Sequence, residues 1–127
     1  MNAAFTPKTV RLVFYIRDEE SCTRCGQGLR WEDRGHGWSM HHRRPRGMGG
    51  SKDPALALPS NALTLCGSGV TGCHGWVETN RDEALEQGFL VSRYGTPEDI
   101  PVLYRGELRF LTSWGSTVRV DEVHHAP

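Results

Sequence analysis

Residues 65–74 read LCGSGVTGCH, and this stretch decides the fold that we expect for the chain. Three of the six residues between its two cysteines are glycine. Glycine adopts backbone conformations that other residues avoid, so the loop can turn tightly enough to bring both thiols to one point. The histidine after the second cysteine stands where a helix over 74–87, closed by a glycine, is predicted to begin.

A second cysteine pair lies about forty residues upstream. Cys22 and Cys25 have the spacing of a zinc knuckle, and with Cys66 and Cys73 they offer the four soft ligands of a structural Zn²⁺. The alternative is two unrelated pairs of buried free thiols. A metal would draw the two ends of the intervening segment together, which would position whatever that segment carries.

Composition also favours a metal-supported fold. Only 37% of the 127 residues are hydrophobic, and 15 are glycine and 7 proline, so an apolar core needs help to specify one structure. The sequence has neither a signal peptide at its start nor an apolar run long enough to span a bilayer. We therefore expect a cytoplasmic protein without membrane contact, in which thiols stay reduced and bind metal.

The remaining patterns predict an α+β fold. Thr6 and Pro7 are typical of a helix start, with a strand as the alternative over 8–20. Residues 38–43 predict a short strand, and 45–59 a loop broken by glycine and proline. Three further strands are expected at the following ranges: 101–104, 107–112 and 116–120. We thus expect a domain over 1–90 and a strand extension over 91–127 that packs on it.

Histidines supply the candidate chemistry. The pair His41–His42, then Asn61, then His74 are individually weak signals, but their order and context resemble the HNH endonuclease motif. The resemblance extends over about residues 17–88 and is closest to small HNH proteins of bacteriophages and prophages. It rests on the following segments: 22–26, 41–50, 60–61 and 65–74.

The resemblance implies a treble-clef-like ββα-metal core with one divalent ion (Mg²⁺, Mn²⁺, Ni²⁺ or Zn²⁺) between the first strand and the helix. His41 and His74 would be metal ligands, although many members carry Asp at the position of His41. His42 would be the general base, since imidazole titrates near neutral pH. Asn61 would hold the loop and orient His42, or ligate the metal directly.

Two residues near His74 are possible additional ligands. Glu78 lies one helical turn after His74, but a solvated carboxylate on the helix face is the preferred interpretation, and Asn80 is a weaker candidate.

The charge distribution favours a polyanionic partner. Between residues 22 and 52 seven Lys or Arg face two acids, whereas from residue 78 onward nine acids face five Arg. DNA phosphate contacts are expected from the basic residues beside the paired histidines: Arg43, Arg44, Arg46 and Lys52.

The leading hypothesis is therefore a DNA endonuclease in phage genome processing or packaging, with a terminase as partner. A defence or self-splicing-element nuclease would use the same chemistry. A zinc-binding module that binds DNA or protein with little catalysis is the alternative from another class. The oligomeric state is left open.

Overall fold

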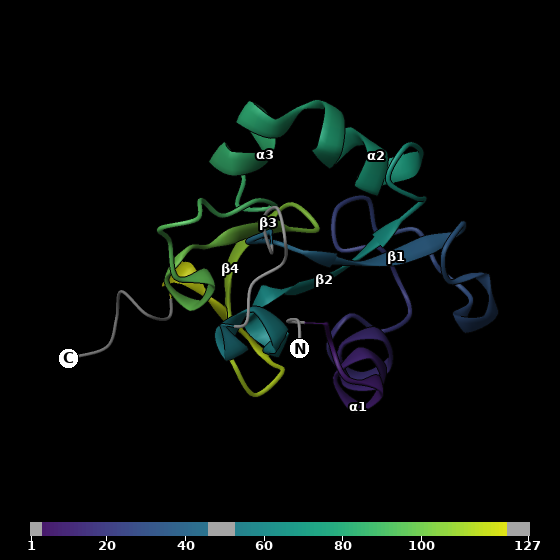
Figure 1. Cartoon of the computed structure of the whole chain (residues 1–127), viewed down its shortest axis with the longest axis horizontal. Coiled ribbons are helices and arrows are strands. Elements are labelled where there is room, and N and C mark those ends of the chain that lie inside the picture. Colours follow the sequence, from purple (N-terminus) through teal and green to yellow (C-terminus); the bar gives the residue numbers. More distant parts are fainter. Residues whose placement is uncertain (1–3, 46–52, 122–127) are drawn as a thin grey trace.

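The computed structural model describes residues 4–45 and 53–121 and shows a small α+β fold (Figure 1). Strand β1 (Trp38–His42) pairs antiparallel with β2 (Ala62–Cys66), with His41 opposite Leu63. In Figure 1 this ribbon lies between helix α1 (Pro7–Arg11) on one side and α2 (Gly72–Thr79) with α3 (Arg81–Glu86) on the other.

The predicted N-terminal helix is confirmed. Thr6 has an extended backbone, its side chain accepts a hydrogen bond from the amide of Thr9, and Pro7 occupies the first turn. The helix continues as a π-helical segment, η1 (Leu12–Arg17), which ends beside β2. Phe14 of this segment packs on Trp38 of β1 and forms the smaller of two apolar clusters.

The predicted helix over 74–87 is present as two helices rather than one. Asn80 leaves the helical region at φ −113° and ψ 57°, and both its amide N–H and its side-chain Nδ2 donate to the carbonyl of Trp76. The side chain thus supplies a local alternative to the helical ladder, as Asn commonly does. Gly88, at φ +80°, closes α3 where the sequence places the stop.

The expected C-terminal strands are confirmed as one antiparallel sheet, β3 (Val102–Tyr104), β4 (Glu107–Leu111) and β5 (Thr117–Arg119). The turns fall at Arg105-Gly106 and around Gly115. The apolar cluster that contains Leu63 and Val77 also contains Val102 and Leu111, so this sheet shares a core with β2 and α2. Four short 3₁₀ turns complete the fold: η2 (Trp31–Asp33), η3 (Pro54–Ala57), η4 (Pro59–Asn61) and η5 (Pro97–Asp99).

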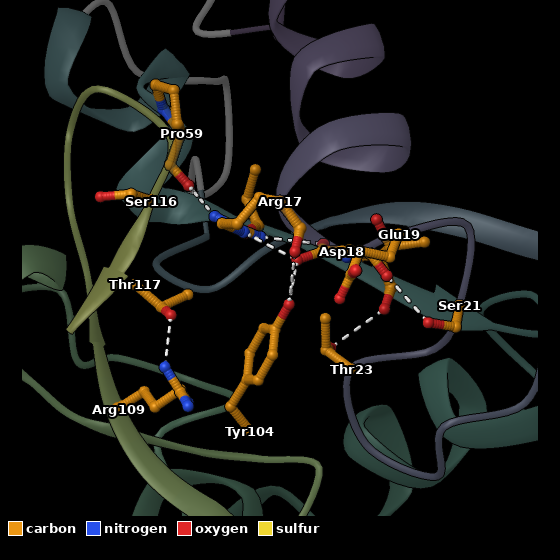
Figure 2. Close-up of polar contacts among 12 residues, drawn as sticks. Arg17, Asp18, Glu19, Ser21, Thr23, Pro59, Tyr104, Arg109, Ser116 and Thr117 are labelled. Carbon is orange, nitrogen blue, oxygen red and sulfur yellow. Dashed lines mark hydrogen bonds and ion pairs between the residues drawn. The ribbon is translucent and has the colours of Figure 1, made fainter. Parts of the chain in front are cut away.

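A buried polar cluster ties the C-terminal sheet to η1 and β2. Figure 2 shows the hydroxyl of Tyr104 directed at Asp18, where it donates across 2.8 Å, while the guanidinium of Arg17 pairs with the same carboxylate at 2.7 Å. Arg17 also donates to the carbonyls of Pro59 and Ala62. Burial and the nearby Asp18 raise the pKa of Tyr104, which therefore stays a neutral donor. The cluster fixes the chain just before β2.

Within the described ranges, no helix combines the length and apolar character needed to cross a membrane.

Candidate metal centres and catalytic pocket

The four cysteines form one cluster. Cys22, Cys25, Cys66 and Cys73 place their sulfurs within 4.8 Å of one another, and Cys25 Sγ lies 3.8 Å from Cys66 Sγ. Four thiolates around Zn²⁺ at about 2.3 Å stand roughly 3.8 Å apart at the corners of a tetrahedron. All four side chains are free thiols. The cluster could therefore hold a structural Zn²⁺.

Backbone geometry around the cluster also suits a bound ion. The amides of Cys66 and Cys73 donate to the sulfurs of Cys22 and Cys66, each across 3.3 Å. Burial raises the pKa of Cys73, and the guanidinium of Arg24, 3.3 Å from its sulfur, opposes that rise. Donors aimed at sulfur favour the thiolate form, which is the form that ligates zinc.

A second candidate metal centre lies between β1 and α2. His41, His74 and Glu78 bring one ligand atom each within 4.8 Å of the others. His41 comes from the end of β1, whereas His74 and Glu78 lie one turn apart on α2 and share a helix face. The Nε2 of His74 is 4.0 Å from a carboxylate oxygen of Glu78.

His41 is held in the protonation state that a metal ligand needs. Its ring is buried, and its Nε2 lies 2.8 Å from the carbonyl of Phe89. A carbonyl only accepts, so Nε2 carries the proton and Nδ1 keeps a free lone pair. Burial lowers the pKa of His41 to about 3, and the ring is neutral at physiological pH.

His74 supplies the observation that best tests the fit of an ion. Among the described residues, its Nδ1 is buried without a hydrogen-bond partner. Burial also lowers the pKa of His74, against the opposing charge of Glu78. Two neutral imidazoles and one carboxylate suit Mn²⁺, Ni²⁺ or Zn²⁺ better than Mg²⁺, which prefers oxygen ligands. The group could hold a second metal.

His42 lies in the same pocket from the neighbouring strand position. A cavity of about 280 Å³ is lined by the following residues: Met40, His41, His42, Pro45, His74, Glu78 and Arg81. Successive strand residues face opposite sides, so His41 meets His74 of α2 while the ring of His42 is directed to the segment ahead of α1. There the ring of His42 stacks on Phe5, and it stays half-buried at the pocket edge.

The side chain of Asn61 bonds to the backbone and does not act as a metal ligand. Its carboxamide is buried, its oxygen accepts from the amide of Arg44 across 2.7 Å, and its nitrogen donates to the carbonyls of Arg44 and Leu56. All of its polar atoms are thus used by backbone groups, which corrects the expectation of direct ligation. Asn61 holds the start of the loop after β1, the first of the roles expected for it.

The expectation for Arg43 as a phosphate contact is wrong. Its side chain is fully buried, and its guanidinium donates to four backbone carbonyls at 2.7–3.0 Å. The acceptors are the carbonyls of Ser60, Gly88, Pro97 and Ile100. Burial, with the neighbouring charge of Arg17, lowers the pKa of Arg43 to about 9. The residue is a structural anchor for the strand that carries both histidines.

The other basic residues expected to contact phosphate are Arg44, Arg46 and Lys52. Arg44 is half-buried, with 21% of its side chain exposed, and pairs with Asp53 at 3.1 Å. Arg46 and Lys52 lie outside the described residues.

Three residues in or beside this pocket go beyond the preferred interpretation of the sequence. Glu78 was named as a possible ligand, with a solvated carboxylate preferred, and its four-residue spacing from His74 brings it into the cluster. Arg81, three positions after Glu78, lies beyond the break on α3 and also lines the pocket. The stack of Phe5 on His42 has no local signal, because the two residues are 37 positions apart in the sequence.

Comparison of the chain with protein-family models, curated proteins and solved structures finds no match.

Proposed function

We propose that the chain is a metal-dependent endonuclease of the HNH type that hydrolyses DNA phosphodiester bonds. One observation carries the proposal: a neutral two-imidazole, one-carboxylate group lies in the same pocket as a further histidine, His42. Phosphodiester hydrolysis needs a cation, a base and access for the phosphate, and this pocket offers a place for each.

In the proposed mechanism His41, His74 and Glu78 hold the catalytic ion through the donor atoms that lie together in the cluster. The ion, when bound, supplies Lewis-acid stabilisation of negative charge on the phosphate and the leaving oxygen. This arrangement, with β1 and β2 on one side and α2 on the other, supports the treble-clef-like ββα-metal interpretation of the fold.

His42 acts as the general base that takes the proton from the attacking water. His42 lines the pocket and is not a member of the metal cluster, so the proposed roles of ligand and base fall to different residues. Phe5 and Arg43 limit its movement, the first by stacking on the ring and the second by anchoring the adjacent backbone. Asn61 acts indirectly, because it holds the backbone of Arg44, two residues after His42.

Cleavage in phage genome processing or packaging, with DNA as substrate and a terminase as partner, belongs to the same proposal and rests on the family resemblance. The cysteine cluster supports it indirectly. A structural Zn²⁺ would fasten the segment before β1, with Cys22 and Cys25, to the end of β2 and to α2, the helix that carries His74 and Glu78.

Nicking of supercoiled plasmid tests the proposal. We expect wild-type protein to nick with Mn²⁺ or Ni²⁺ and to stop on addition of EDTA, and His42→Ala to be slower by a factor of about 100 or more. His36→Ala is the matched control, because His36 is an exposed histidine that lies outside the pocket and pairs with Asp33. Absence of nicking with every ion would instead favour the zinc-binding interaction module.

A further inference from the structure

We propose that Arg81 binds the scissile phosphate in the catalytic pocket. To do so, it gives up its ion pair with Glu78. This assignment rests on the proposed endonuclease function and adds a substrate-contacting residue that the histidine pattern does not contain. Of the described residues that line the pocket, Arg81 alone carries a permanent positive charge. A phosphodiester entering this pocket meets no other fixed cation of the described chain there.

The two oxygens of Glu78 face different partners. Oε2 lies 4.0 Å from the imidazole of His74, inside the candidate metal group, whereas Oε1 lies 3.2 Å from Nη1 of Arg81. The carboxylate therefore stands between the metal site and the arginine. A group that binds Arg81 from the pocket side is necessarily close to the position where the ion would be held.

Arg81 has donors to spare. Its side chain is about half exposed, and Glu78 is its one hydrogen-bond partner among the described residues. A guanidinium has five N–H donors in a planar fork that matches two phosphate oxygens. By contrast, Arg43 spends its donors on carbonyls, and Arg44 is engaged by Asp53 and the carbonyl of Gly95.

The break between α2 and α3 suits Arg81 to exchange Glu78 for a phosphate. Arg81 is the first residue of α3, directly after Asn80, so its side chain projects from a helix end and not from a packed helix middle. Its pair with Glu78 is a surface ion pair, which is weak in water and readily exchanged for a phosphate.

The experiment compares Arg81→Ala, Arg81→Lys and Arg30→Ala in single-turnover plasmid nicking with Mn²⁺. Arg30 is the matched control, an exposed arginine paired with Glu32 away from the pocket. We expect Arg81→Ala to be slower about 10- to 100-fold, Arg81→Lys to recover part of the loss, and Arg30→Ala to match wild type.

A second measurement separates phosphate binding from mere support of Glu78. Mn²⁺ affinity, measured by calorimetry without DNA, should be unchanged in Arg81→Ala, because the ligand atoms stay in place. A loss of Mn²⁺ affinity in proportion to the loss of rate would show that Arg81 only positions Glu78, and equal nicking by Arg81→Ala and wild type would also overturn the assignment. Absence of nicking by wild type would overturn the endonuclease proposal itself, so the two failures are distinct.

Discussion

The ring of Phe5 lies stacked on the ring of His42, with centroids 4.0 Å apart and planes 15° from parallel. Phe5 precedes helix α1, whereas His42 ends strand β1, so the contact joins the N-terminal segment to the proposed catalytic base. Aromatic pairs of this kind contribute about 0.5–1.5 kcal/mol beyond the area they bury. The N-terminal segment thereby contacts a residue that lines the candidate pocket.

Loss of this stack should slow catalysis without loosening the metal. Phe5→Ala removes the stacking partner of the His42 ring, and we expect single-turnover nicking to fall about 2- to 10-fold. Mn²⁺ affinity should stay at the wild-type value, because Phe5 is not part of the metal cluster. Phe5→Tyr keeps the ring and serves as the control. Wild-type nicking by Phe5→Ala would show that the stack does not position the base.

Removal of a cysteine ligand should remove zinc and much of the fold. Cys22 is buried at the centre of the cluster, so Cys22→Ser should bind less than one zinc by elemental analysis and lose its cooperative thermal transition. Cys25 is exposed, and a histidine there completes a Cys₃His site. Cys25→His should therefore keep zinc. A Cys22→Ser protein that is zinc-free yet folds and melts as wild type would refute the structural site.

Replacement of Arg43 should destabilise the protein instead of weakening DNA binding. Arg43→Met fills similar space but leaves four buried carbonyls without their donor, which we expect to lower the free energy of unfolding by about 3 kcal/mol or more. Urea denaturation measures this loss. An unchanged unfolding midpoint with weakened DNA binding would restore the role that the sequence suggested.

Arg44 allows the opposite test. Its half-buried side chain carries a charge that reaches solvent, so Arg44→Ala should weaken binding to every duplex sequence by a similar factor. The slope of log K against log salt concentration should become shallower by about one. Binding titrations on two unrelated duplexes at several salt concentrations provide the measurement. Equal affinity and equal slope would exclude Arg44 from the DNA interface.

The buried ring of His41 predicts a pH dependence of stability. Its pKa is about 3 in the fold against 6.5 for an ordinary histidine, so below pH 6.5 the unfolded chain takes up a proton that the native chain refuses. This stabilisation is complete above about pH 6.5 and is lost as the pH falls toward 3. Between pH 6.5 and about pH 5 the loss amounts to about 2 kcal/mol.

His41→Gln isolates this contribution, because it keeps the other titrating groups and the four cysteines. Urea unfolding of both proteins across this range should show the difference in their free energies shrinking as the pH falls. A difference that is constant with pH would mean that His41 is protonated equally in both states.

Local chemistry explains what the sequence could predict. The cap at Thr6 and the stop at Gly88 each depend on one or two adjacent residues, and each is where the pattern places it. The cysteine cluster was predictable for a similar reason, since ligand spacing encodes its two halves.

Long-range contacts explain what it could not predict. Arg43 sits in a basic run that is typical of a phosphate-binding loop, but its acceptors are 17 to 57 residues away along the chain. The same holds for Asn61, whose amide completes the bonding of a loop that begins 17 residues earlier. The break at Asn80 arises because its side chain competes with the helical backbone for the carbonyl of Trp76. Helical periodicity of apolar residues carries no information about this competition.

The carbonyls that accept hydrogen bonds from Arg43 determine how much of the chain is needed to satisfy this buried side chain. Two of them, Pro97 and Ile100, belong to the extension, and the amide of Val91 also bonds back to the carbonyl of Arg43. A fragment ending near residue 90 would retain every proposed ligand and the base. It would nevertheless lack two of the four carbonyls that accept from the buried guanidinium of Arg43. Residues 91–100, which precede β3, thus complete the hydrogen bonding of an arginine next to the candidate site, although none of them lines the pocket.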